Sequence, residues 1–208
     1  IHLLTNKKGM FTNAVTGFFN IYLKLIAAFA PDGAAAAFDL KAPTFRHQKY
    51  DGYKAGRKGL PDELAVQMPY VKKLLTALGV PVIECEGYEA DDILGTLAAK
   101  CDSAGSQCIL ATGDRDSFQL ITDNVFVNLA STKEDVLYTP AKIAEVYGVS
   151  PRQMIDVKAL MGDASDNIPG VAGIGEKTAL SLIQKYQSIE ELYKNIDSID
   201  VTKSVRTK

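Results

Sequence analysis

Short apolar segments alternating with helical patterns are the feature that most restricts the fold of this 208-residue chain. Four short apolar runs predict strands: residues 34–38, 80–84, 107–111 and 125–129. Three longer segments with apolar residues at helical spacing predict helices: residues 12–29, 63–78 and 89–104. Strands that alternate with helices favour a mainly parallel central sheet flanked by helices. The predicted fold class is therefore α/β.

The pattern changes near residue 138. Beyond it, four short segments predict helices, and no strand pattern interrupts them: residues 140–147, 151–161, 176–186 and 189–195. We therefore predict an α/β core over residues 1–138 and a helical portion over residues 139–208.

Eight acidic residues adjoin the predicted strands and helices. They are Asp39, Glu89, Asp91, Asp92, Asp114, Asp116, Asp163 and Asp166. Ligands of an open parallel sheet bind beyond the carboxyl ends of its strands, where Asp39 and Asp114 are expected. Gathered carboxylates repel one another and need a counter-charge, which hard divalent cations with oxygen ligands supply. The pattern predicts a two-metal site for phosphoryl chemistry.

Ordinary structural roles compete with this interpretation for single residues. Glu89, Asp91 and Asp92 suit the first turn of a helix, where the helix dipole favours acids. Asp114 and Asp116 also suit a plain loop. A calcium-binding EF-hand is excluded for residues 163–174, because Ile168 and Ile174 stand where that loop needs glycine and glutamate.

Composition narrows the class of protein. The formal net charge is −2, but the eight acids account for it, and the rest of the chain carries an excess of Lys and Arg. An acidic site within basic surroundings suits an enzyme that acts on a polyanion. Three cysteines without a CxxC pair predict reduced thiols, and two histidines leave little material for zinc or histidine-based catalysis. The longest apolar run, residues 21–30, is too short to span a membrane.

A glycine-rich segment, residues 168–179, lies between two predicted helices. Glu176 stands where a P-loop needs lysine, and the segment does not follow a strand as a dinucleotide fingerprint does. A hairpin between helices exposes backbone amides that hold a nucleic-acid phosphate without reading the sequence. A simple connection between helices is the alternative.

The segment 41–60 is basic and contains aromatic residues. Its charged and aromatic side chains are Lys41, Phe45, Arg46, Lys49, Tyr50, Asp51, Tyr53, Lys54, Arg57 and Lys58. Basic groups follow a phosphate backbone while aromatic rings stack on unpaired bases. The segment therefore predicts a contact with single-stranded nucleic acid, with a solvated basic loop as the alternative.

Together these motifs resemble the 5′-nuclease domains of bacterial DNA polymerase I, within the flap-endonuclease superfamily. The matching segments, in the order of the family, are residues 38–47, 52–57, 87–92, 112–116 and 162–179. The resemblance implies that the eight acids hold two Mg²⁺ or Mn²⁺ ions. It also implies that residues 157–186 form a helix-hairpin-helix DNA clamp that binds a monovalent cation such as K⁺. Residues 41–60 correspond to the arch through which a 5′ single strand passes.

The resemblance assigns roles to particular side chains. Lys54 and Arg57 are the expected catalytic cations beside the scissile phosphate. The expected DNA-binding residues are Arg46, Tyr53, Lys54, Gly170, Gly173, Gly175, Lys177 and Thr178. The implied function is a structure-specific 5′-nuclease, a 5′→3′ exonuclease and flap endonuclease of replication and repair. Its implied substrates are 5′ ends, flaps and primer RNA paired to DNA.

Two rival functions stay open at this point. A PIN-like ribonuclease shares the acidic α/β site but not the glycine hairpin. A non-catalytic module that grips branched DNA is the other. The resemblance further implies a monomer in the bacterial cytoplasm, joined to a polymerase portion and without a membrane partner.

The family opens with a strand that ends in a metal-binding aspartate. The first residues, Ile1 to Leu4, are similar to the end of the helical segment that follows that strand. We therefore expect the sequence to be a piece of a larger protein that lacks this strand and its ligand.

Overall fold

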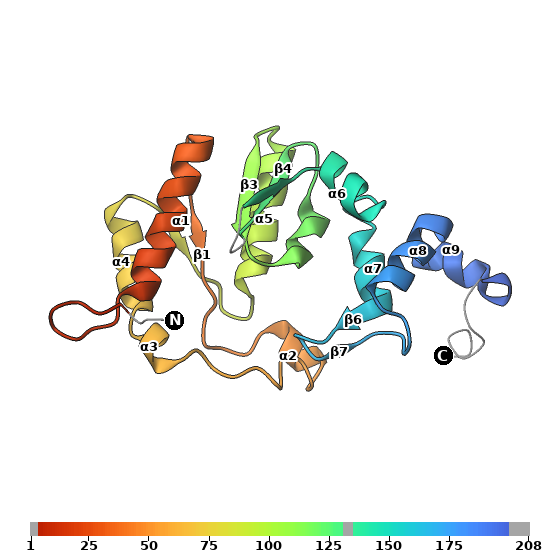
Figure 1. The fold of residues 1–208 in the computed structure, drawn as a ribbon, viewed down its shortest axis with the longest axis horizontal. Coiled ribbons are helices and arrows are strands. Elements are labelled where there is room, and N and C mark those ends of the chain that lie inside the picture. Colours follow the sequence, from red (N-terminus) through yellow and green to blue (C-terminus); the bar gives the residue numbers. More distant parts are fainter. Residues whose placement is uncertain (1–3, 131–134, 200–208) are drawn as a thin grey trace. The chain divides into compact units, whose positions relative to one another are not determined.

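The structure, a computed structural model, describes residues 4–130 and 135–199. It contains two compact units, each of which is built from two stretches of the chain. The first unit is Ile1–Ala42 with Arg57–Ala90, and the second is Pro43–Gly56 with Asp91–Lys208 (Figure 1). The predicted α/β core begins with residues 1–3, and the predicted helical portion ends with residues 200–208. Both of these segments lie outside the described residues. Each unit is described by itself.

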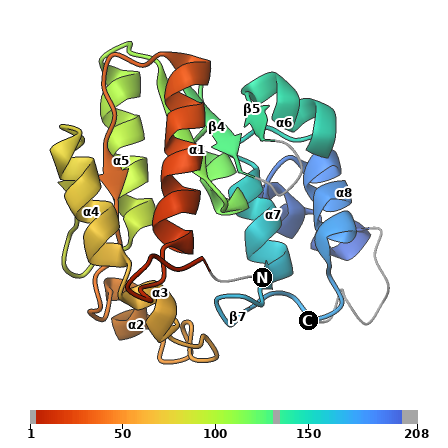
Figure 2. The same ribbon diagram turned by 60° about the vertical axis from the view of Figure 1, so that its left-hand side comes forward.

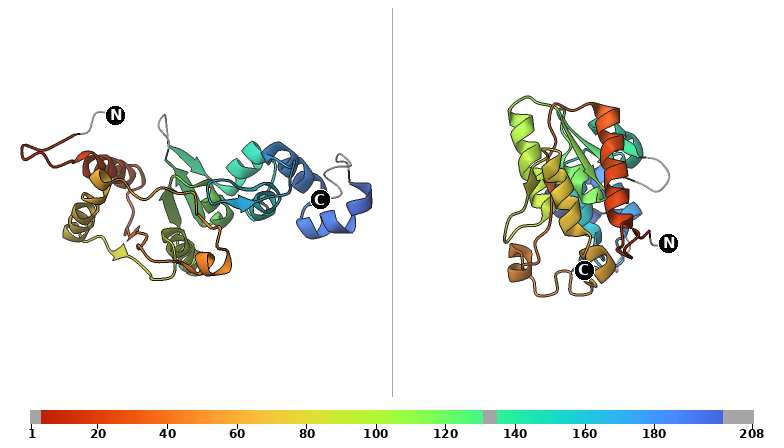
Figure 3. Two further views of the ribbon diagram at one scale, coloured as in Figure 1. Left: turned by 90° about the horizontal axis from the view of Figure 1, so that it is seen from below. Right: turned by 90° about the vertical axis from the view of Figure 1, so that its left-hand side faces the viewer.

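The first unit packs helices beside a short parallel strand pair. Its elements are α1 (Asn13–Phe29), β1 (Ala36–Ala37), α3 (Asp62–Ala65), α4 (Met68–Ala77) and β2 (Val82–Ile83). β1 and β2 pair in parallel, with Ala36 opposite Val82. α1 lies alongside α4, as Figures 2 and 3 show from two sides. Apolar side chains of α1 and Phe38 pack against Val71 and Leu75, which are fully buried.

The helix predicted over residues 63–78 is wrong in one respect, because it is two helices. α3 ends at Ala65 and α4 begins at Met68. Pro69 explains the division, since proline has no N–H to continue a helix but is tolerated in a first turn. The short break between α3 and α4 contains Gln67.

Gln67 links this break to the start of α1. Its side chain is fully buried, and its Oε1 accepts hydrogen bonds from the backbone N–H groups of Ala14 (2.8 Å) and Val15 (3.3 Å). The same side chain donates through Nε2 to the Glu63 carbonyl at 2.6 Å. Thr12, the residue that precedes α1, makes no side-chain cap. Gln67 therefore satisfies N–H groups at a helix start that would otherwise lack partners.

The second unit contains the remaining described elements. Before the sheet they are α2 (Phe45–Lys49) and α5 (Ala90–Ser103), whose first residue falls in the first unit. The sheet and its connections are β3 (Cys108–Thr112), η1 (Arg115–Leu120), β4 (Val125–Leu129) and β5 (Val136–Tyr138). The rest are α6 (Pro140–Tyr147), α7 (Met154–Met161), β6 (Gly162–Asp163), β7 (Ile168–Pro169), α8 (Glu176–Tyr186), α9 (Ile189–Lys194) and η2 (Ile196–Ser198).

β3 and β4 are parallel, with Cys108 opposite Val125, and β5 adds an antiparallel edge. The α/β class and the parallel pairing are confirmed, although the strands form separate small sheets. β5, η1 and the pair β6–β7 were not predicted. β5 is only three residues long, and the β6–β7 pair is two residues on each side, which is too short to leave an alternating pattern.

One hydrophobic cluster joins the sheet to the C-terminal helices. It includes Leu110 of β3, Phe118 of η1, Ile143 of α6, Val157 of α7 and Ile183 of α8. Burial of each such side chain contributes about 1.5–3 kcal/mol. The cluster includes residues on both sides of residue 138, so the domain boundary predicted there stays a prediction.

Gly162 and Gly170 cross at close range between β6 and β7. Gly162 has a φ of +73°, and a Cβ atom there would overlap the backbone of Gly170. A Cβ atom at Gly170 would overlap the backbone of Met161 and Gly162. Glycine is required at both positions because no side chain fits. This crossing fixes the acidic residues 163–166 to the start of the glycine-rich segment.

We predict that Gln67→Leu lowers the free energy of unfolding by about 1–3 kcal/mol, the cost of leaving buried polar groups without partners. Gln107→Leu is the matched control, because Gln107 is exposed in the loop before β3. Urea unfolding monitored by circular dichroism measures both. Equal stability of the two variants would contradict a capping role for Gln67.

Candidate metal and nucleic-acid site

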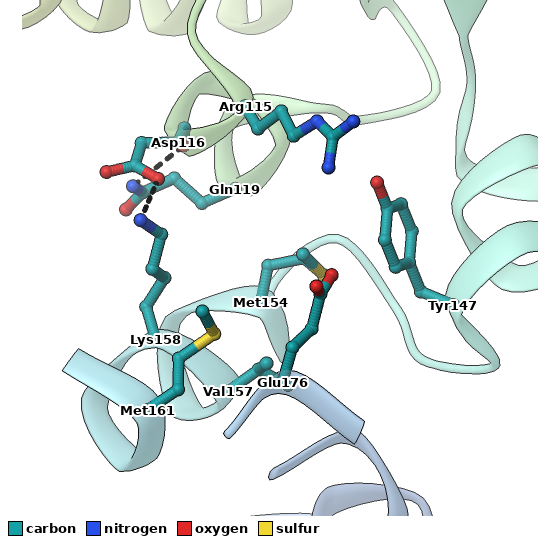
Figure 4. A pocket seen from close by; sticks show the side chains of 9 residues that line it. All are labelled: Arg115, Asp116, Gln119, Tyr147, Met154, Val157, Lys158, Met161 and Glu176. Carbon is teal, nitrogen blue, oxygen red and sulfur yellow. Dashed lines mark hydrogen bonds and ion pairs between the residues drawn. The ribbon is translucent and has the colours of Figure 1, made fainter. Parts of the chain in front are cut away.

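Lys158 joins two of the predicted metal ligands. Its Nζ lies 2.7 Å from Asp116 Oδ1 in η1 and 2.8 Å from Asp163 Oδ2 in β6. Figure 4 shows Lys158 reaching from α7 to Asp116. Asp114 belongs to the same group, because its Oδ1 accepts a hydrogen bond from the Asp116 N–H at 2.8 Å and caps η1. We call these four residues the Lys158 cluster.

The cluster shifts the pKa values of its members. Burial raises the pKa of Asp116, and repulsion from Asp114 and Asp163 adds to this, while Lys158 partly offsets it. Burial also opposes ionisation of Asp163, but hydrogen bonds from Lys158 and Ser165 outweigh it and hold its pKa well below the ordinary value. Burial disfavours the charged form of Lys158, yet its two carboxylate partners raise its pKa overall. The cluster is therefore an ion-pair network in which one ammonium pairs with two carboxylates, and a third, that of Asp114, lies beside them.

The local backbone determines where the acids of the Lys158 cluster lie. Asp114 follows β3, at the carboxyl end of a parallel strand, as predicted. Asp163 Oδ1 accepts hydrogen bonds from the Ser165 N–H at 2.8 Å, the Ser165 hydroxyl at 2.7 Å and the Asp166 N–H at 3.2 Å. The carboxylate thus organises the turn that carries the next predicted ligand.

The Asp166 side chain contacts the basic segment. Its Oδ2 accepts a hydrogen bond from the Tyr53 hydroxyl at 3.1 Å and lies 3.9 Å from Lys54 Nζ. Its carbonyl accepts from the Lys54 N–H at 3.0 Å, and Asn167 Nδ2 donates to the Gly52 carbonyl at 2.8 Å. We call the contacts between residues 52–54 and 166–167 the loop clasp.

The basic segment 41–60 is more ordered than its sequence suggests. Thr44 and Tyr53 are buried, and His47 caps α2 by accepting the Thr44 N–H through Nδ1 at 3.1 Å. The Tyr53 ring meets the His47 ring edge to face at 5.1 Å between centroids. Stacking of Tyr53 on a base therefore stays a prediction. Arg57 is exposed and belongs to the first unit.

Arg46 pairs with Asp92 at the start of α5. The guanidinium makes two hydrogen bonds to the carboxylate, at 2.7 and 2.8 Å. Such a two-point pair fixes both side chains, because the planar guanidinium matches the carboxylate. Asp91 beside it is exposed. A predicted DNA-binding cation and a predicted metal ligand are thus partners.

Asp39 and Glu89 are the predicted ligands in the first unit. Asp39 follows β1, and its Oδ1 accepts a hydrogen bond from the Ala90 N–H at 2.6 Å. Glu89 is buried and directly precedes α5. Asp39 therefore lies at the first N–H group of a helix, where a carboxylate is favoured.

The donor set fits hard divalent cations. Among residues 4–130 and 135–199, no three His, Cys, Asp or Glu side chains are assembled to hold a metal ion. The acids are carboxylates, the ligands that Mg²⁺ and Mn²⁺ prefer. Within the Lys158 cluster, burial and then repulsion from Asp114 and Asp163 raise the pKa of Asp116. Their negative charge is the property that a divalent cation would neutralise.

The glycine-rich segment opens α8. Gly173 has a φ of +89°, and Gly175 is the residue before the first turn of the helix. A Cβ atom at Gly175 would meet no atom within 4 Å. Lys177 and Thr178 are exposed in the first turn. The segment therefore presents helix N–H groups beside open space, whereas Gly170 is required inside the fold.

A pocket of 130 Å³ adjoins the Lys158 cluster (Figure 4). The side chains that line it are Arg115, Asp116, Gln119, Tyr147, Met154, Val157, Lys158, Met161 and Glu176. Arg115 and Glu176 point toward its interior from η1 and α8. The lining of the pocket is mostly apolar and carries charge of both signs.

Sequence reasoning missed Lys158 and Asn167. Lys158 is the one lysine within the apolar pattern of α7, which is a signal that it has a buried partner. Asn167 has a φ of +57°, a backbone conformation that asparagine adopts more readily than most residues. Neither signal names a partner, because Asp116 and Gly52 lie far from Lys158 and Asn167 in the sequence.

Two further features concern the whole chain. Cys85, Cys101 and Cys108 are free thiols, and burial followed by the neighbouring Cys101 raises the pKa of Cys108 to about 11. In the described part of the chain, every helix is too short or too polar to cross a lipid bilayer.

The low pKa of Asp163 predicts a pH-dependent stability. Its folded pKa lies below the ordinary value of 3.8, so its contribution is present above 3.8 and is lost as the pH falls through the folded value. With EDTA present, the stability difference between wild type and Asp163→Asn should shrink from about pH 6 to about pH 3, as measured by urea unfolding. Asp123→Asn, at an exposed loop residue, is the control and should show no such trend. A constant difference for Asp163→Asn would contradict the ion pair with Lys158.

Solved structures share this fold. T5 5′-exonuclease with bound zinc ions superposes with a TM-score of 0.76 over 93% of this chain and 74% of that chain, at 23% identity. The catalytic core of Rad2 in complex with a DNA substrate superposes with a TM-score of 0.61 over 98% of this chain and 64% of that chain, at 18% identity. At these identities the likeness concerns the fold.

Sequence comparison gives closer relatives. DNA polymerase I of Caldicellulosiruptor bescii is 47% identical over 209 residues, which cover 99% of this chain and 24% of that protein. DNA polymerase I of Bacillus subtilis is 45% identical over 95% of this chain and 23% of that protein. The chain thus spans about a quarter of the length of the curated relatives that it matches.

Two family models cover the chain end to end. The 5′-3′ exonuclease N-terminal resolvase-like domain matches residues 1–148, and the 5′-3′ exonuclease C-terminal SAM fold matches residues 149–208. The resemblance predicted from the motifs is confirmed, and the chain belongs to the 5′-3′ exonuclease family.

Proposed function

We propose that the chain is a metal-dependent, structure-specific 5′-nuclease that hydrolyses phosphodiesters in DNA, or in primer RNA paired to DNA. The Lys158 cluster is the observation that carries the proposal. It combines acids that follow a parallel strand with an acid of the 163–166 turn, on the scaffold of a 5′-3′ exonuclease. Carboxylates gathered in this way are suited to hold the cations of phosphoryl chemistry.

In this proposal the predicted acids hold two Mg²⁺ or Mn²⁺ ions. Asp114, Asp116, Asp163 and Asp166 are the proposed ligands of the second unit, and Asp39, Glu89, Asp91 and Asp92 stay predicted ligands. When bound, such ions supply the Lewis acidity that activates water and stabilises the leaving oxygen. No side chain of the cluster has to act as a general base, which agrees with a chain that has two histidines.

The basic side chains bind and orient the substrate. Lys54 and Arg57 place positive charge beside the scissile phosphate, where charge develops during the reaction. Lys54 and Arg46 are each paired with a proposed ligand, Asp166 and Asp92. A phosphate that approached these pairs would accept hydrogen bonds from the side chains of Lys54 and Arg46. The carboxylates of Asp166 and Asp92 would then be available as ligands for the cations.

The glycine-rich segment is the proposed grip on duplex DNA. N–H groups at the start of α8 suit a backbone phosphate, and Lys177 and Thr178 add donors. Gly170 would act indirectly, because its lack of a side chain lets the segment fold against Gly162. A K⁺ ion held by carbonyl groups of this hairpin, a monomeric state, a polymerase portion in the same polypeptide and a place in the bacterial cytoplasm belong to the same proposal.

Cleavage of a labelled 5′-flap DNA, with single-stranded RNA as the second substrate, tests the activity directly. With Mg²⁺ or Mn²⁺ the flap should be cut and the RNA spared, and EDTA should abolish cutting. Preferential cutting of the RNA would favour a PIN-like ribonuclease. Tight flap binding without cleavage would favour a binding module.

We predict that Asp114→Ala abolishes flap cleavage, while flap binding survives or tightens. The substitution removes a proposed ligand but also removes negative charge near the phosphates. Gel-shift titration and single-turnover cleavage measure the two effects, with Asp123→Ala as the control at an exposed acid. Near-normal turnover of Asp114→Ala at saturating Mg²⁺ would count against Asp114 as a ligand.

We predict that Gly175→Ala weakens binding of duplex DNA about tenfold or more, a change of about 1.4 kcal/mol. The added methyl group meets no protein atom within 4 Å, so the fold should be unchanged and only a close ligand should be affected. Fluorescence anisotropy with a duplex and with a short single strand measures the effect, and the melting temperature checks the fold. Equal losses on both substrates would remove the segment from its proposed role.

A further inference from the structure

The loop clasp joins two segments that are more than one hundred residues apart in sequence. The turn at residues 52–54 contributes a carbonyl, a phenol and an N–H group, and residues 166–167 supply the partners. Figure 1 shows α2, which precedes the turn, beside the β6–β7 pair that carries residues 166–167. Both segments belong to the second unit.

Both segments have unusual backbone conformations at the clasp. Lys54 has a φ of +54° and Asn167 a φ of +57°. Asparagine enters this left-handed region readily, whereas for lysine it costs free energy that the surrounding contacts have to offset. The N–H group of Lys54 donates to the Asp166 carbonyl at 3.0 Å, so a clasp contact is made at the strained residue itself.

The side chain of Asn167 holds the turn from the other side. Its Nδ2 donates to the Gly52 carbonyl at 2.8 Å, and the same carbonyl accepts from the Ala55 N–H at 3.2 Å. A Cβ atom at Gly52 would lie 2.6 Å from the end of the exposed Tyr50 side chain, which would have to move aside. The Gly52 carbonyl is therefore held by two donors, and the Asn167 amide ties the 52–54 turn to the acidic turn.

We propose that Asn167 is a positioning residue, which holds the 52–54 turn and so directs Lys54 toward the scissile phosphate. The inference rests on the proposed nuclease function, in which Lys54 acts on that phosphate. Asp166 also contacts the turn, but it is a proposed metal ligand. Asn167 carries no charge, so its substitution separates the position of Lys54 from the binding of cations.

Two substitutions isolate the amide. Asn167→Gly keeps the ease of the left-handed backbone and removes the donor. Asn167→Asp keeps the size of the side chain and replaces the donor by an oxygen that the Gly52 carbonyl repels. Asn195→Asp is the matched control, because it removes an amide that donates to the Glu191 carbonyl at 2.8 Å, away from the clasp.

The first measurement is hydrogen exchange of the Lys54 amide, followed by mass spectrometry or NMR in the absence of DNA. Both Asn167 variants should exchange about 5- to 30-fold faster than wild type, the factor that corresponds to loss of one hydrogen bond. The Asn195 control should exchange at the wild-type rate. The second measurement is flap cleavage, in which kcat should fall in both variants. In Asn167→Gly, which adds no charge, KM and the Mn²⁺ affinity should stay unchanged.

The outcomes are distinguishable. Wild-type exchange at Lys54 in both Asn167 variants would overturn the clasp. Faster exchange with an unchanged kcat would overturn the positioning role. A wild-type chain that does not cut the flap would count against the proposed function alone, and exchange at Lys54 would still decide whether Asn167 holds the turn.

Discussion

The charge of closely spaced carboxylates is the constraint on which the second unit depends. Asp114, Asp116 and Asp163 come from η1 and β6, and Lys158 of α7 provides the cation that lets them share one region. Breaking a partly buried ion pair leaves an uncompensated charge, which costs more than the pair contributes. The ion pairs therefore tie the end of β3 to the turn after α7, and the same charge makes the cluster attractive to divalent cations.

Glycine determines how the acidic turn continues. Gly162 and Gly170 cross where no side chain fits, so the chain returns at once from the acids to the start of α8. The loop clasp adds the basic turn at residues 52–54 to the same construction. The acids, the basic turn and the start of α8 are thereby parts of one compact unit. This is an arrangement that suits a reaction on a nucleic-acid backbone.

Local patterns predicted much of this fold. The periodicity of residues 12–29 and 89–104 gave α1 and α5 nearly to the residue, and the apolar run 125–129 is β4. Such patterns arise because the apolar side chains of a helix or strand lie on the one face that is buried, so neighbouring residues alone show them. The break at Gln67 was not predicted, because its cause is a hydrogen bond to residues 14 and 15, which are distant in sequence.

The candidate site, like the fold, could be predicted only in part. Residue type and strand ends pointed to Asp114, Asp116 and Asp163, because carboxylates beside an apolar strand need a special reason. Which cation each acid meets could not be predicted, since Lys158, Lys54 and Arg46 reach their partners through tertiary packing. His47 had no predicted role, and in the structure it caps α2.

Paramagnetic broadening by Mn²⁺ shows whether the Lys158 cluster binds a divalent cation. We expect sub-stoichiometric Mn²⁺ to broaden the backbone amide signals of Asp114, Asp116 and Asp163 before that of Asp123, an exposed acid outside the cluster. Broadening at Asp123 as early as at the three clustered acids would contradict the claim that the Lys158 cluster is a divalent-cation site.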